Sequence, residues 1–273
     1  MVRRKLYLVT TISCGERSEA HVISKLSPLR YPRDYTCGFG RQLISKTRIL
    51  EAAKNLDIGN ARKLLADKPS LLGVTDRQGR NLLHIACSAD CAVLGLPESA
   101  SLRMIDLLLD RGLDLESSVG KARCTPLFFA VARAKNPKLV KHLLERGASP
   151  TRAPGGGLYA AGWYDDVESL GLLIRAGAKI DVAVGITPFL AVWLWKKFEA
   201  AKFLAEKGAD VNFQNPKNGK TALHYGVEKE YDPALLKWLV KHGASAEIKD
   251  RDGVTARLRA WRKRDKKWFA AMA

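Results

Sequence analysis

A glycine recurs along the chain at a nearly constant interval, each time at the end of a leucine-rich segment that also carries charge. Successive glycines of this kind lie 35, 30, 31 and 35 residues apart. A period of this size indicates an array of small supersecondary units, each packed against its neighbours. The sequence therefore predicts a repeat architecture whose unit-closing glycines are Gly112, Gly147, Gly177, Gly208 and Gly243.

A second landmark, a Thr-Pro-Leu-His-like tetrapeptide, lies 21 or 22 residues before most of these glycines. Copies begin at Thr125, Thr187 and Thr221, and a weaker copy begins at Asn81. Thr and Asn suit a helix N-cap, and Pro suits the first helical position because its missing N–H would be unpaired there. The glycine supplies the left-handed residue that ends a helix. Each unit is predicted to be a cap, a short helix, a turn, a second helix and a stop.

The two landmarks together resemble the ankyrin repeat, a β-turn followed by two antiparallel helices. The segment 76–86 matches the turn and first helix of such a unit, and the segment 250–256 opens another. The resemblance covers residues 46–273 and implies an all-α ankyrin-repeat solenoid with β-turn fingers. It implies five full units plus degenerate N-terminal and C-terminal capping units, with boundaries at 46–75, 76–115, 120–150, 151–181, 182–213, 216–248 and, for the cap, 249–273.

Two departures interrupt the pattern. Gly156 and Gly157 replace the Thr-Pro pair in the unit 151–181. The unit that begins at Asp76 carries about ten extra residues between its helices, in the region 87–101. We expect the surface of the array to be irregular at both places.

Residues 1–45 lie outside the repeat and mix Gly, Ser, Pro and Arg without a sustained apolar period, so we expect a basic, flexible N-terminal extension. Their apolar stretch at 6–12 is short and contains two Thr, which disfavours a secretory or lipoprotein signal. No stretch approaches the ~18 apolar residues of a membrane span. The expected location is cytoplasmic, and the alternative is a secreted effector that uses the same surface.

The net charge of +18 is concentrated at the ends of the chain. Residues 1–48 hold ten Lys/Arg against three Asp/Glu, and residues 249–273 hold nine against three. Basic ends of this kind attract polyanions by counterion release, which leaves nucleic-acid association as an alternative function. No nucleic-acid-binding motif accompanies the charge. In the cap we expect Leu258, Trp261, Trp268 and Phe269 to turn inward while the basic side chains stay in water.

Metal binding and catalysis find little support in the sequence. The five cysteines are an odd set without a Cys-x-x-Cys pair, which favours a reducing compartment and buried thiols. Cys87 and Cys91 lie near His84 but lack a fourth ligand, and the glycine run 155–157 is not followed by the Lys of a phosphate-binding loop. The acids at 165 and 166 fall in a predicted turn, where they are expected to be solvated. We therefore expect no enzyme, no metal and no cofactor.

The resemblance implies protein binding through the finger tips and the concave face, where the first helices end. Carried onto this chain, these positions are strongly basic at the fingers and aromatic in the middle of the groove. Trp, Tyr and Arg dominate the energetics of protein interfaces. The predicted partner-binding residues are Arg77, Arg80, Lys121, Arg123, Arg152, Lys217 and Lys220 at the fingers and Trp163, Tyr164, Leu194, Trp195 and Lys229 at the helix ends.

Three of these residues, Trp163, Tyr164 and Trp195, belong to adjacent units and are predicted to form one central patch. The surrounding Lys and Arg favour an acidic segment of a partner protein. The alternative is that Trp163 and Trp195 pack between units as core. Trp193 lies two residues from Trp195 and therefore points to a different face, which makes it the expected core residue. The chain is expected to be a monomer.

Overall fold

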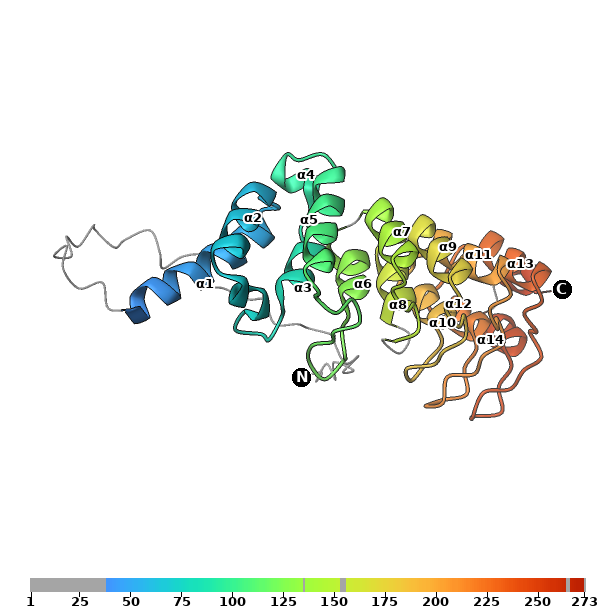
Figure 1. Cartoon of the computed structure of the whole chain (residues 1–273). Coiled ribbons are helices and arrows are strands. Elements are labelled where there is room, and N and C mark those ends of the chain that lie inside the picture. The colour runs from blue at the N-terminus through green and yellow to red at the C-terminus, as the bar shows by residue number, and fades with distance from the viewer. Residues whose placement is uncertain (1–37, 135, 153–155, 264–265, 273) are drawn as a thin grey trace, which may run out of the picture.

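The computed structural model describes residues 38–134, 136–152, 156–263 and 266–272, and these residues form a row of helix pairs (Figure 1). Consecutive pairs pack side by side, so that α10 contacts both α8 and α12. The prediction of an all-α solenoid is confirmed. The pairs are α1 (Gly38–Lys54) with α2 (Ile58–Asp67), α3 (Leu82–Cys87) with α5 (Ser99–Asp110), α6 (Pro126–Phe129) with α7 (Pro137–Glu145), α8 (Gly156–Trp163) with α9 (Val167–Arg175), α10 (Pro188–Leu194) with α11 (Phe198–Glu206), α12 (Ala222–Glu228) with α13 (Pro233–Lys241), and α14 (Ala256–Arg262) with α15 (Lys266–Ala271).

Three short elements depart from the simple pair. A 3-10 helix, η2 (Pro69–Gly73), follows α2, and a π-helical segment, η3 (Ala130–Ala134), extends α6. The extra residues of the second pair form the short helix α4 (Cys91–Leu94), which Figure 1 shows at the edge of the row. The insertion predicted at 87–101 therefore adds a helix to one side and leaves the stack continuous.

The ends of the array differ from the expected boundaries. Helix α1 begins at Gly38, so the boundary expected between residues 45 and 46 falls inside this helix. The remainder of the expected extension, residues 1–37, lies outside the described residues, as do Cys14 and Cys37. At the other end the degenerate capping unit predicted at 249–273 contains a complete helix pair, α14 with α15.

The residues that start and stop the helices are those the motifs predicted. The hydroxyl of Thr125 accepts the N–H of Phe128 at 3.3 Å, and Thr187 does the same for Leu190 at 3.3 Å. At the other end of the units, the five closing glycines have φ between 90° and 96°, a region that other residues enter at a cost. Local backbone demands thus fix where each helix begins and ends.

Trp193 forms the centre of the core between α10 and α12. It is 1% exposed, stacks on Phe189 and meets the rings of Phe198 and Tyr231 edge to face at 5.6 Å each. Its indole N–H donates to the carbonyl oxygen of Ala222 at 2.8 Å, which joins two consecutive helix pairs. The prediction that Trp193 is a core residue is confirmed.

The prediction for the cap was wrong for two of its four apolar residues. Trp261 is 65% exposed and Phe269 is 40% exposed, so neither side chain is covered by the described residues. Trp268 does turn inward, and its indole N–H donates to the carbonyl oxygen of Tyr231 at 2.9 Å. Leu258 is half-buried. An amphipathic pattern alone does not tell whether a neighbour is present.

His224 is buried and connects its own unit to the next one. Its Nε2 donates to the carbonyl oxygen of Val254 at 3.0 Å, and its Nδ1 accepts the N–H of Thr221 at 3.1 Å. This pattern requires the neutral ring, since a protonated Nδ1 has no lone pair to offer. Burial is the largest influence on the pKa of His224 and lowers it below the ordinary value of 6.5.

We expect acid to weaken the stack through this histidine. In the unfolded chain His224 takes up a proton near its ordinary pKa of about 6.5, whereas the folded chain takes it up only at lower pH. The free energy of unfolding should therefore fall as the pH drops below that value. Urea denaturation at a series of pH values measures the fall, which should be smaller in the His224→Gln variant. An identical pH dependence in both chains would show that this histidine is not responsible.

Candidate functional site

The loops between helix pairs are β-turn fingers that project to one side of the row, as the α8–α14 half of Figure 1 shows. Each of three fingers is folded around one acidic or amide side chain. Asp76 accepts the N–H groups of Gln78 and Arg80 at 2.9 Å each, and Asn215 accepts the N–H of Lys217 at 3.0 Å. Asp250 performs the same role in the last finger. Side chains at the finger tips are therefore held on ordered turns.

The finger residues predicted to bind a partner divide into two groups. Arg80 is half-buried and pairs with Asp76 at 2.7 Å, and Lys220 is half-buried and pairs with Glu228. Both ion pairs lie within one unit, where they connect the basic side chain to its own finger or first helix. The remaining finger residues are exposed: Arg77, Lys121, Arg123, Arg152 and Lys217.

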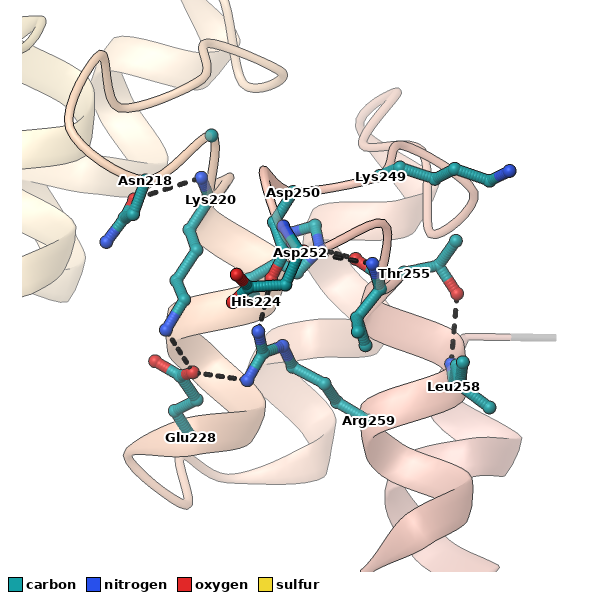
Figure 2. A network of polar contacts seen from close by, with 12 residues as sticks. Asn218, Lys220, His224, Glu228, Lys249, Asp250, Asp252, Thr255, Leu258 and Arg259 are labelled. Atoms are coloured by element: carbon teal, nitrogen blue, oxygen red, sulfur yellow. Dashed lines mark hydrogen bonds and ion pairs between the residues drawn. The ribbon is translucent and has the colours of Figure 1, made fainter.

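Lys220 belongs to an ion network that joins the last full unit to the cap (Figure 2). Glu228 of α12 accepts from Lys220 and, at 2.6 Å, from Arg259 of α14. Arg259 also pairs with Asp250, whose side chain is fully buried. Burial alone would raise the pKa of Asp250, but the N–H of Val254 and the Arg259 guanidinium outweigh it and hold that pKa below its ordinary value. The spacing of the repeat motifs does not predict this network.

At the opposite end of the first helices from the fingers, an aromatic patch is exposed. We call Trp163, Tyr164 and Trp195 the aromatic step. Trp163 is 51% exposed, and its ring meets that of Trp195 edge to face with 4.9 Å between centroids. Trp195 is half-buried against the core and also contacts Tyr159 at 6.4 Å. The structure thus brings Trp163 and Trp195 together across two units, as their equivalent positions predicted.

Asp165 fixes the turn that carries this step. It adopts a left-handed conformation with φ of 58°, and its carboxylate accepts the N–H of Ala200 at 2.7 Å. Ala200 lies in the first turn of α11, in the following unit, where Lys197 offers no capping side chain. Asp166 caps α9 by accepting the N–H of Ser169 at 2.9 Å. The expectation that these two acids are merely solvated was wrong, because each of them satisfies the start of a helix.

Two lysines, Lys196 and Lys229, lie beside Trp195 of the aromatic step. Lys229 donates to the carbonyl oxygen of Leu194 at 3.4 Å, directly before Trp195 in the chain. Lys196 follows Trp195 and has a φ of 60°, a conformation that costs a residue with a Cβ about 1 kcal/mol. Burial lowers the pKa of Lys229, and the charge of Lys196 lowers it further. The sequence prediction included Lys229 and missed Lys196, whose only signal was its position beside Trp195.

The part of the chain that the structure describes offers no group of three His, Cys, Asp or Glu side chains placed to hold a metal ion. Cys87, Cys91 and Cys124 are buried and are not joined in disulfides, and burial strongly raises the pKa of the Cys87 thiol. Nor is any helix within the described ranges long and apolar enough to cross a bilayer.

Comparison with known families places the repeats in a named class. A family model described as "Ankyrin repeats (3 copies)" matches residues 158–262, and a model of a single ankyrin repeat matches residues 123–153. The chain is also similar to the nuclear factor NF-kappa-B p105 subunit of Gallus gallus, with 29% identity over 206 residues. That match covers 72% of this chain and 20% of the relative, so the chain spans about a fifth of the length of that protein.

Solved structures share the same arrangement of helices. The ankyrin repeat domain of Bcl-3, described as a unique member of the IkappaB protein family, superposes with a TM-score of 0.67 at 21% identity, covering 82% of this chain and 96% of that one. The human ASB11 ankyrin repeat domain superposes with a TM-score of 0.63 at 21% identity, covering 82% of this chain and 95% of that one. At this level of identity the likeness establishes the fold.

Proposed function

Because this chain is an ankyrin-repeat protein, we propose that it is a non-catalytic binding module that holds an acidic segment of a partner protein. Domains of this family generally mediate protein–protein interaction. The observation that carries the proposal is the edge-to-face contact of Trp163 with Trp195, which leaves half of Trp163 exposed on a structured surface. An aromatic residue in this position offers large contact area at a small entropic cost.

The exposed basic residues of the fingers support an acidic partner. The exposed finger residues are basic, and the whole chain has a net charge of +18. Complementary charge speeds encounter and selects against basic competitors. The proposed surface consists of Arg77, Lys121, Arg123, Arg152 and Lys217 at the fingers, positioned in part by Arg80 and Lys220, and of Trp163, Tyr164, Leu194, Trp195 and Lys229 at the helix ends.

Trp163→Ala is the direct test of this surface. We expect binding of the captured partner to weaken by about 30-fold or more, as at an interface hot spot of 2 kcal/mol, while the free energy of unfolding falls by less than about 2 kcal/mol. The affinity is measured with the full chain and a partner identified by pull-down, and the stability by urea denaturation.

A matched control is available in Trp261, an equally large and more exposed tryptophan on the cap. Trp261→Ala should leave the affinity unchanged. If both variants bind alike, the aromatic step is not the binding surface. If Trp163→Ala unfolds the array, the alternative that this residue is core is correct.

Polyanion binding through the basic cap is the second candidate, and the structure gives it less support. Three basic side chains of the cap are already in ion pairs: Arg257 with Glu247, Arg259 with Glu228, and Lys263 with Glu230. Phosphate contacts would make log affinity fall steeply and linearly with log salt concentration, whereas an aromatic-centred surface gives a shallow fall. We also propose that the chain acts as a monomer in the cytoplasm. Its three buried cysteines outside disulfides support a reducing compartment.

A further inference from the structure

The two lysines beside the aromatic step, Lys196 and Lys229, form what we call the lysine pair. Both side chains are exposed, and they come from the ends of consecutive first helices, α10 and α12. Lys229 reaches back to the carbonyl oxygen of Leu194, and Lys196 lies over the ring of Tyr231 at 5.6 Å. Each lysine side chain thus contacts a residue of the other helix pair. Two positive charges therefore lie at one junction between units.

The two acids adjacent to Lys229 in sequence form their ion pairs with other residues, although the charge of Glu228 still raises the pKa of Lys229. Glu228 is adjacent to Lys229 in sequence but accepts from Lys220 and Arg259. Glu230 pairs with Lys263 of the cap at 2.7 Å. Among the described residues neither member of the lysine pair forms an ion pair, so the junction retains an excess of positive charge.

The backbone at Lys196 adds a second observation. Its φ of 60° is a conformation in which glycine would be unstrained. The equivalent turns of three other helix pairs place Leu56, Asp165 and Glu230 in the same conformation, so it belongs to the turn between the two helices of a pair. Asp165 caps α11 and Glu230 pairs with Lys263, whereas Lys196 is exposed and makes a ring contact. The turn thus holds the backbone of Lys196 in a fixed position beside Trp195.

We propose that the lysine pair is an anion subsite that receives an Asp or Glu carboxylate of the partner, while an adjacent apolar side chain of the same segment covers Trp163. The inference rests on the proposed function and specifies its partner: an acid next to a large apolar residue. The contact between Lys229 and Leu194 places the lysine pair directly beside Trp195. A carboxylate there relieves the repulsion between the two ammonium groups, which adds to burial in lowering the pKa of Lys229.

The experiment is a selection of phage-displayed random peptides on the full chain. The variant Lys196→Gly, Lys229→Gln removes both charges and relieves the strained backbone, so its unfolding midpoint should equal or exceed that of the natural chain. Loss of binding therefore cannot be attributed to unfolding. The control is the variant Lys237→Gln, Lys241→Gln, which also removes two exposed charges. Both residues lie in α13, the second helix of its pair, whereas the aromatic step and the lysine pair lie at the ends of first helices.

The natural chain and the control should enrich peptides with an acid beside a large apolar residue, and the lysine-pair variant should lose this preference for an acid. One enriched peptide and its amide analogue, in which Asp or Glu is replaced by Asn or Gln, are then titrated by tryptophan fluorescence. We expect the amide change to weaken binding to the natural chain at least tenfold and to have almost no effect on binding to the lysine-pair variant.

The remaining outcomes separate this inference from the proposed function. If the amide change weakens binding equally in both chains, while binding still requires Trp163, the acid is bound elsewhere and only the inference fails. If a phosphoserine analogue binds more than tenfold tighter than the acidic peptide, the subsite is one for phosphate and the carboxylate assignment is wrong. If no enriched peptide depends on Trp163, the proposed function itself fails.

Discussion

Replacing Trp193 by alanine is expected to lower the free energy of unfolding by about 4 kcal/mol, the largest stability loss of any tryptophan in the described residues. The indole is almost completely buried, contacts three aromatic rings and donates to Ala222 in the next helix pair. Its removal leaves a large cavity and breaks the hydrogen bond that joins the two helix pairs. Because an array is stabilised by contacts between neighbouring units, we also expect α12–α15 to unfold separately from the rest.

Urea denaturation followed by circular dichroism measures this effect, and a second transition would indicate the separate unfolding of the last helix pairs. Trp163→Ala is the matched control, since it removes the same side chain from an exposed position. A loss of less than about 1 kcal/mol for Trp193→Ala would contradict the central packing role of this residue.

Replacing Asp250 by alanine is expected to cost about 3 kcal/mol, the second largest effect. The carboxylate accepts the N–H groups of Asp252 and Val254 and pairs with Arg259, and its side chain is fully buried. Alanine therefore removes both the fold of the last finger and the partner of a half-buried guanidinium. Chemical denaturation of the full chain measures the loss.

Two further variants separate the contributions of Asp250. Asp250→Asn keeps an oxygen that can accept both N–H groups but removes the charge, so its cost should be intermediate. Asp252→Ala changes an exposed acid of the same finger and should cost less than about 0.5 kcal/mol. Because the pKa of Asp250 is lowered in the folded state, its contribution is present above the ordinary Asp pKa and is lost as the pH falls through the lowered value. An Asp250→Ala chain as stable as the natural one would exclude this role for the ion network.

The fold could be predicted from the sequence because its units depend on local backbone requirements. Thr187 at an N-cap and Gly208 at a left-handed stop are each required by a conformation that few other residues adopt at low cost. Such requirements recur at every unit and so appear as a period. The approach of Trp163 to Trp195 was predictable for the same reason, since equivalent positions of neighbouring units lie side by side.

The rest of the site depends on contacts between units that have no recurrent pattern. Asp165 caps a helix 35 positions further on, and Arg259 pairs with an acid of α12 that lies 31 positions earlier. Basic composition likewise does not tell an exposed Lys217 from a Lys220 that is held by Glu228. For Trp261 the prediction was wrong because the apolar pattern of the cap does not tell which side of α14 is buried. These features follow from which side chains meet in space.

The hydrogen bond from Ala200 to Asp165 limits how far these modules can be exchanged or deleted. A helix pair in this part of the row does not carry its own complete set of caps, since α11 relies on a carboxylate from the unit before it. Excising α8 and α9 as a cassette would expose the start of α11 and would remove Trp163 with it. Recombination between such arrays therefore preserves this junction only when the two units are transferred as a block.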